Sequence, residues 1–259
     1  MSWLRVERRG AVRRLVLDRP EVRNAVPADG WRDLSAALAD FERSEDRVLV
    51  LTGAGGAFCS GAELRSEFLA EVSSPTRAAR RMDEVSAMVS ALHGLTKPSI
   101  AAVDGPAVGA GMNLALACDL VIATSRARFA ELFVRRGLTV DGGGTWLLPR
   151  IVGLQRAKEL ALTGRSVEAE EAREIGLCLE VVEPGALDDR VDEIAAALLE
   201  GAPVAQMLTK QAIGRSWELP LGAALAWEAQ SQVICFQTED FAEGLAAFAE
   251  RRRPEFRGG

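Results

Sequence analysis

The sequence predicts an α/β fold, with a body over residues 1–195 and a helical region over residues 196–259. Three observations lead to this class. Short apolar runs with the length of buried strands alternate with stretches in which apolar residues recur at helical spacing. Segments rich in glycine follow two of these runs. From Leu187 onward, helical spacing continues without another strand.

The first elements are predicted from apolar alternation and turn residues. Leu4–Arg9 and Val12–Leu17 flank Gly10, which predicts a β-hairpin. A helix is predicted over residues 27–44, because proline is tolerated in the first turn of a helix. The apolar run 47–52 predicts a buried strand.

Strands and helices continue to alternate, which predicts parallel pairing with right-handed crossovers. Predicted strands cover residues 99–103, 119–123 and 180–182. Predicted helices cover residues 76–92, 109–118, 145–152, 154–163 and 167–175, and further helices start at Leu187, Pro203, Leu221 and Glu239.

Composition excludes several classes of function. The net charge of −6 argues against a nucleic-acid partner, because phosphate binding needs clustered cations. No window approaches the roughly 20 apolar residues of a membrane helix, and the N-terminus lacks an apolar signal core, so we expect a cytoplasmic protein without a membrane partner. The four cysteines lie far apart, which excludes a Cys-x-x-Cys metal site. With His93 as the single histidine and no tyrosine, acid–base chemistry falls mainly to carboxylates.

Two segments rich in glycine and alanine, 52–64 and 103–111, each follow a predicted buried strand. Such residues let a ligand approach backbone N–H groups, and a helix start adds unpaired amides. Two such loops at neighbouring strand ends predict an oxyanion hole, in which each donor contributes about 3 kcal/mol when charge develops. The alternatives are tight turns without a function, and a phosphate loop, whose Gly-x-x-x-x-Gly-Lys-Ser/Thr motif is absent.

A third segment carries an acid. Asp141 precedes three consecutive glycines and an apolar helix. An acid at such a position is commonly a turn or N-cap residue. The functional alternative is a carboxylate base held over a flat ligand, with the glycines making room for that ligand. These residues alone leave both possibilities open.

Together, the three segments resemble the enoyl-CoA hydratase/isomerase (crotonase) superfamily, and the resemblance extends from the run 17–25 to the run 248–256. It implies a spiral of repeated ββα turns, with a helical C-terminal region that forms trimers, often paired into hexamers. It also implies an acyl-CoA thioester as ligand, with no metal or redox cofactor. The two oxyanion amides correspond to Ala62 and Ala110.

Further substrate contacts follow from the same resemblance. Arg23 matches a basic position near the phosphates and pantetheine of coenzyme A. The stretch 63–81 is expected to shape the pocket for the acyl group, whose identity the sequence does not reveal. The other expected substrate-binding residues are Ala25, Ser60, Gly61, Glu63, Leu64, Gly109, Asn113, Phe133, Leu138 and Trp146.

The catalytic acids distinguish the members of the family. Its hydratases use two glutamates, at positions where this chain has Asn113 and Phe133, and Glu131 lies two residues before the second position. Its isomerases use one carboxylate at a position that matches Asp141. The run 141–150 is especially similar to 2-(1,2-epoxy-1,2-dihydrophenyl)acetyl-CoA isomerases and to Δ3-Δ2-enoyl-CoA isomerases. The resemblance therefore implies an isomerase, with Asp141 as catalytic residue.

In that mechanism Asp141 shuttles one proton on a thioester enolate. Burial against Phe133, Leu138 and Trp146 is expected to raise its pKa toward the useful range. Two alternatives remain. One is a hydratase that uses Asp141 or Glu131 with a water held by Asn113, and the other is a non-catalytic acyl-CoA-binding protein.

Overall fold

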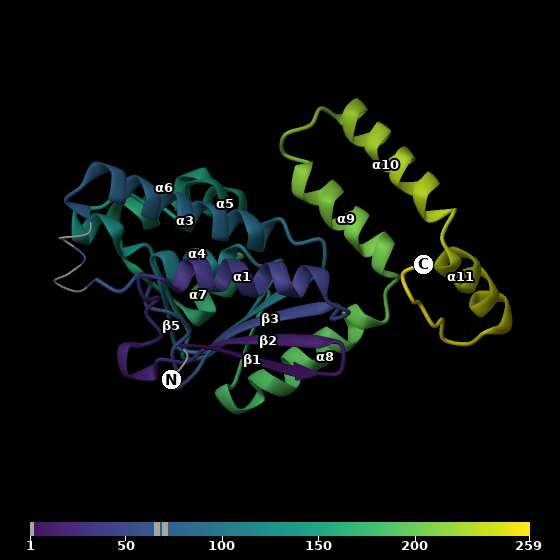
Figure 1. Ribbon diagram of the computed structural model, residues 1–259, viewed down its shortest axis with the longest axis horizontal. Helices are drawn as coiled ribbons and strands as arrows, with labels where there is room; N and C mark the ends of the chain where they lie inside the picture. Colours follow the sequence, from purple (N-terminus) through teal and green to yellow (C-terminus); the bar gives the residue numbers. More distant parts are fainter. Residues whose placement is uncertain (1–2, 65–67, 69–71) are drawn as a thin grey trace. The chain divides into compact units, whose positions relative to one another are not determined.

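The computed structural model describes residues 3–64, 68 and 72–259 (Figure 1). These residues form two compact units, one within 1–95 and 99–192, and one with 96–98 and 193–259. The predicted roles of the two regions, an acyl-CoA site and an oligomerisation surface, stay predictions. Part of the expected acyl-pocket stretch, residues 65–67 and 69–71, lies outside the described residues. Within the described residues, no helix has the length and apolar character needed to cross a membrane.

The first unit is built on a six-stranded sheet. Its first two strands are antiparallel, and every later neighbour is parallel, as the alternating pattern predicts. The predicted hairpin is confirmed, because the two strands pair from Leu4 with Leu17 to Arg9 with Val12. In sheet order, the strands are β1 (Leu4–Arg9), β2 (Val12–Leu17), β3 (Val48–Gly53), β4 (Ser99–Val103), β6 (Leu120–Thr124) and β9 (Glu180–Val182).

The structure also contains a second sheet of three short strands, which was not predicted from the sequence. It consists of β5 (Pro106–Val108), β7 (Arg128–Ala130) and β8 (Ser166–Glu168). The helix predicted over residues 167–175 is wrong at its start, because β8 pairs antiparallel with β7 and α7 begins only at Ala169. Pro106–Val108 lies within the glycine-rich segment 103–111, and Ser166–Glu168 overlaps the start of the predicted helix, so neither stretch was interpreted as a strand.

Helices cover one face of the main sheet, where α1 and α3 lie side by side (Figure 1). The first helix begins at Gly30, three residues after the predicted start. Residues 27–30 form a separate turn, in which the N–H of Gly30 donates to the carbonyl oxygen of Pro27 (2.9 Å). The helices are α1 (Gly30–Arg43), α3 (Pro75–His93), α4 (Ala110–Leu116), α5 (Gly144–Val152), α6 (Leu154–Thr163), α7 (Ala169–Glu174), α8 (Leu187–Leu199), α9 (Pro203–Arg215), α10 (Leu221–Cys235) and α11 (Glu239–Glu250), with 3-10 turns at Pro20–Val22, Leu132–Arg136 and Pro184–Ala186.

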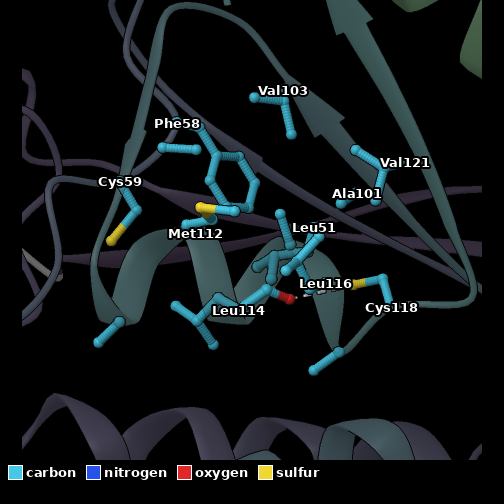
Figure 2. Packing of buried hydrophobic residues seen from close by; sticks show 14 of the residues in the cluster. Leu51, Phe58, Cys59, Ala101, Val103, Met112, Leu114, Leu116, Cys118 and Val121 are labelled. Atoms are coloured by element: carbon cyan, nitrogen blue, oxygen red, sulfur yellow. Dashed lines mark hydrogen bonds between the residues drawn. The ribbon is translucent and has the colours of Figure 1, made fainter. Parts of the chain in front are cut away.

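Helix α4 lies inside the core of the first unit. All of its residues are buried. Figure 2 shows Met112, Leu114 and Leu116 of this helix among strand residues such as Leu51 and Val103, all at most 3% exposed. A short helix that is apolar on every side needs such a setting. The packing fixes the direction of α4 and thereby the position of its N-terminal amides.

Candidate active site

The two glycine-rich segments lie against each other. Cys59 and Ala107 form a parallel bridge. The N–H of Cys59 donates to the carbonyl oxygen of Pro106 (3.0 Å), and the N–H of Val108 donates to the carbonyl oxygen of Cys59 (2.9 Å). Strand-like hydrogen bonds therefore hold the segment around Ser60 beside the entry to α4.

Glycine is required at two points of this contact. Gly61 has φ +92°, and a β-carbon there would lie 2.9 Å from the carbonyl oxygen of Val108. A β-carbon on Gly111 would lie 2.3 Å from the carbonyl oxygen of Cys59, well inside contact distance. The backbones approach this closely because neither position carries a side chain.

The first predicted amide, that of Ala62, has no acceptor among the described residues. Its neighbours are both fixed: the carbonyl oxygen of Gly61 accepts from Val26, and the N–H of Glu63 donates to the carbonyl oxygen of Val26 (2.9 Å each). In a parallel bridge, the peptide N–H between two such bonds points away from the partner strand. The Ala62 N–H is therefore held in one orientation, and no described residue accepts a hydrogen bond from it.

The second predicted amide, that of Ala110, begins helix α4 and likewise lacks an acceptor in the described part of the chain. The preceding Gly109 has φ 55° and ψ −126°, a conformation that favours glycine. Its N–H donates to the carbonyl oxygen of Ala130 (2.8 Å). A β-carbon on Gly61 would lie 3.6 Å from the nitrogen of Ala110, so the two amide-bearing segments are close neighbours.

The Asp141 segment packs against the same helix start. The side-chain amide of Asn113, which is fully buried, donates from Nδ2 to the backbone carbonyl oxygen of Asp141 (2.8 Å). A β-carbon on Gly142 would lie 3.9 Å from Cα of Ala110, and one on Gly144 would lie 2.6 Å from Nδ2 of Asn113. Glycines thus allow the acid-bearing turn to approach the predicted oxyanion amides.

Burial raises the pKa of Asp141 above its usual range. Its Oδ1 atom is inaccessible to solvent and has no hydrogen-bond partner among the described residues. Phe133 is buried at 8% exposure, and a β-carbon on Gly109 would lie 3.6 Å from its ring. Leu138 was expected to bury the carboxylate, but its side chain is 44% exposed, because it follows the turn at Gly137.

Glu131 was expected to act only in the hydratase alternative, and the isomerase mechanism gave it no role. Its side chain is fully buried, and neither carboxyl oxygen has a hydrogen-bond partner in the described part of the chain. Burial raises the pKa of Glu131 to about 8, the Asn113 amide opposes the rise, and the charge of Asp141 adds to it. Alternation along an extended strand gives the missed signal, because Phe129 and Glu131 share a face.

Other residues that were predicted to bind substrate form hydrogen bonds or ion pairs within the protein. Glu63 forms a two-pronged ion pair with Arg19, with Nη1 to Oε2 at 3.0 Å and Nη2 to Oε1 at 2.9 Å. Arg19 also donates to the carbonyl oxygen of Ala25 (3.1 Å). Arg23 has an exposed side chain, and its carbonyl oxygen accepts from the N–H of Ser60 (3.0 Å). The pair between Arg19 and Glu63 therefore braces the segment that carries Ala62.

Two further predicted residues lie at the edge of this region. Leu64 is 51% exposed. Trp146 is half-buried, with the Arg150 guanidinium 3.8 Å from its ring centroid and the ring of His93 edge-on at 5.2 Å. Within the described residues, no group of three His, Cys, Asp or Glu side chains is placed to hold a metal ion.

Comparison with known proteins identifies the family. The family model "Enoyl-CoA hydratase/isomerase" matches residues 7–259. The chain is 38% identical to the short-chain-enoyl-CoA hydratase of Clostridium acetobutylicum, over 96% of this chain and 95% of that protein. It is 37% identical to the 1,2-epoxyphenylacetyl-CoA isomerase of Escherichia coli, over 94% of each. The crystal structure of an enoyl-CoA hydratase from Bacillus anthracis matches with TM-score 0.94 and 33% identity over 100% of both chains.

These matches show that the protein is an enzyme with the crotonase fold. The predicted fold class is therefore confirmed. The chain belongs to the enoyl-CoA hydratase/isomerase family. Its relatives include both hydratases and an isomerase at similar identity. The choice between hydratase and isomerase must therefore rest on the acidic residues of this chain.

The brace between Arg19 and Glu63 gives a testable prediction. If the Ala62 amide acts as predicted, Arg19→Gln should lower kcat for enoyl-CoA turnover about tenfold with little change in KM, because small displacements of an oxyanion donor are costly. Arg165→Gln is the matched control, because Arg165 forms ion pairs with Glu159 and Glu171 on another part of the unit. An equal decrease in kcat in the two variants, measured by steady-state kinetics, would contradict the bracing role of Arg19.

Proposed function

We propose that the protein is an enoyl-CoA isomerase, which moves a double bond from the 3- to the 2-position of an acyl-CoA thioester. The Ala62 and Ala110 amides would hold the thioester oxygen, and Asp141 would carry the proton. Coenzyme A enters as part of the substrate, and the reaction as written needs no separate cofactor. The observation that carries this proposal is the half-buried Asp141, packed against the start of α4 beside one of the two amides.

The chemistry needs one base that acts twice. Asp141 removes a proton from C2, and the electron pair of that C–H bond spreads through the C3–C4 double bond and onto the thioester oxygen. Two N–H donors stabilise that negative charge. Asp141 then returns the proton to C4, and the double bond forms between C2 and C3. A carboxylate with a raised pKa suits both steps, because it is a stronger base and remains able to release the proton.

The side chains at the two positions of the hydratase glutamates support this proposal. Asn113 cannot exchange protons at neutral pH, and it already donates to the backbone of Asp141. Phe133 is apolar and buried, and its ring lies next to Gly109. An apolar surface at this place excludes water from an acyl chain. Such surroundings favour a proton shuttle over addition of water.

The central test is Asp141→Asn. The amide keeps the shape of the side chain but has no basic oxygen, so isomerisation of a 3-enoyl-CoA should fall at least about 100-fold. Binding of a saturated acyl-CoA, measured by calorimetry, should persist, because the Asn113 bond goes to the backbone of residue 141. A variant that binds acyl-CoA and keeps most of its turnover would refute the role of Asp141.

Hydration is a second candidate, and one observation favours it. The carboxyl groups of Glu131 and Asp141 are near enough for the charge of Asp141 to raise the pKa of Glu131. Water addition needs an acid and a base together. We expect crotonyl-CoA hydration to be at least tenfold slower than isomerisation of a 3-enoyl-CoA under equal conditions. Faster hydration would reverse the assignment, and binding without either turnover would indicate a non-catalytic acyl-CoA-binding protein.

Assembly into a homotrimer, or a dimer of trimers, belongs to the same proposal. Large apolar side chains of the second unit are exposed in the single chain, among them Trp217 (72%), Leu221 (74%) and Phe248 (86%). Helix α10 has no buried residue. Exposed apolar area of this extent is typical of an interface. Sedimentation equilibrium should give a multiple of three chains, and a monomer at micromolar concentration would contradict the proposal.

A further inference from the structure

Asn24 has a fully buried side chain whose amide is hydrogen-bonded on both sides. Nδ2 donates to the carbonyl oxygens of Ala54 (2.9 Å) and Ala57 (2.7 Å), which uses both of its hydrogens. Oδ1 accepts from the backbone N–H of Arg19 (2.8 Å). Each of these bonds satisfies a backbone group that would otherwise be left unpaired. The side chain therefore fixes the turn around residue 24 against residues 54–57.

The backbone of Asn24 contributes to the same turn. It is left-handed, with φ 56°, and so is that of Arg23, with φ 52°. Asparagine adopts this conformation more readily than most residues that carry a side chain. The N–H of Asn24 donates to the carbonyl oxygen of Arg19 (2.9 Å). Main chain and side chain of residue 24 thus together close the turn that begins at residue 19.

The turn places residues 22–26, the template segment, alongside residues 59–63, the oxyanion segment. Hydrogen bonds join the two segments along their length. They run from the N–H of Ser60 to the carbonyl oxygen of Arg23 (3.0 Å), from the hydroxyl of Ser60 to the carbonyl oxygen of Val22 (3.1 Å), from the N–H of Val26 to the carbonyl oxygen of Gly61 (2.9 Å) and from the N–H of Glu63 to the carbonyl oxygen of Val26 (2.9 Å). The direction of the Ala62 N–H therefore depends on where the template segment lies.

Asn24 also contacts the oxyanion segment directly, through Cys59. The Cys59 thiol is fully buried and donates to the carbonyl oxygen of Asn24 (3.2 Å), and its sulfur accepts from the N–H of Gly61 (3.4 Å). Burial raises the pKa of the Cys59 thiol to about 12, so the thiol keeps its proton at neutral pH and remains a donor. This link fixes the peptide next to Ala62.

We propose that Asn24 is a positioning residue for the Ala62 amide: its side chain fixes the template segment, which in turn sets the direction of the oxyanion segment. The inference rests on the proposed role of that amide in holding the thioester oxygen. It holds for isomerisation and for hydration alike, because both reactions place negative charge on that oxygen. Without the side chain, the acyl-CoA site keeps its shape, but one of its two donors loses its fixed direction.

Hydrogen exchange tests the positioning without reference to any reaction. Asn24→Gly removes the side chain and permits the left-handed backbone. In this variant the amides of Gly61 and Glu63 should exchange at least about tenfold faster, because their acceptors are no longer fixed. Amides of α6 serve as the internal control and should be unchanged. Mass spectrometry of peptides that cover the oxyanion segment gives the rates, and unchanged rates in the folded variant would overturn the proposal.

Binding of an enolate tests the consequence for the site. Acetoacetyl-CoA readily loses its C2 proton, and its enolate absorbs in the near ultraviolet and carries negative charge on the thioester oxygen. Asn24→Gly should weaken binding of this enolate about tenfold more than binding of a saturated acyl-CoA, and should lower kcat about tenfold with little change in KM. An equal loss for both ligands would overturn the positioning role. The absence of enolate binding in the unaltered protein would instead refute the proposed function of the two amides.

Two further variants separate positioning from a general loss of stability. Ser99→Ala is the matched control, because Ser99 is also fully buried and its hydroxyl is hydrogen-bonded to Asp119 (2.8 and 3.0 Å) at the start of β4. It should lower the melting temperature and leave enolate binding unchanged. Cys59→Ala removes the thiol link alone and should give the same selective loss at about threefold, also if Asn24→Gly does not fold. Selective loss of enolate binding in Ser99→Ala, or none in Cys59→Ala, would overturn the proposal.

Discussion

The close approach of two backbone segments is the constraint on which the site depends. A β-carbon at Gly61 or Gly111 would meet a carbonyl oxygen of the facing segment at 2.9 or 2.3 Å. With hydrogen at both places, the strand-like bonds around Cys59 form and set the direction of two amides that have no acceptor among the described residues. Such preorganised donors need no rearrangement when charge develops on a bound oxygen.

The same packing that makes α4 a core helix also sets the protonation chemistry. Met112 and Leu114 anchor the helix among strand residues, and between them Asn113 is carried into a fully buried position. Water is excluded around that amide, so Asp141 and Glu131 lose hydration and their pKa values rise. The burial that holds α4 in the core therefore also raises the pKa values of Asp141 and Glu131.

The sequence predicts those features that rest on long patterns. The strand Ser99–Val103 and the helix Leu154–Thr163 have the predicted bounds, because five or more residues show their period. The second sheet was missed because β5 lies within a glycine-rich segment and β8 overlaps the start of a predicted helix. The late start of α1 reflects a turn over residues 27–30, which the apolar spacing of the helix does not distinguish from a first helical turn. The sequence also did not reveal the ion pair of Glu63 with Arg19, and the contact of Glu63 with substrate stays a prediction.

Burial of Glu131 bears on the choice between the two reactions of the family. Hydration must deliver one proton to carbon while another leaves water, so an acid and a base must both reach the reacting atoms. Glu131 can retain a proton, but its oxygens are shielded from anything as large as water. Isomerisation needs only one acid–base group, because Asp141 alone can take and return the same proton. A shielded acid beside a half-buried base is thus better matched to double-bond migration than to addition of water.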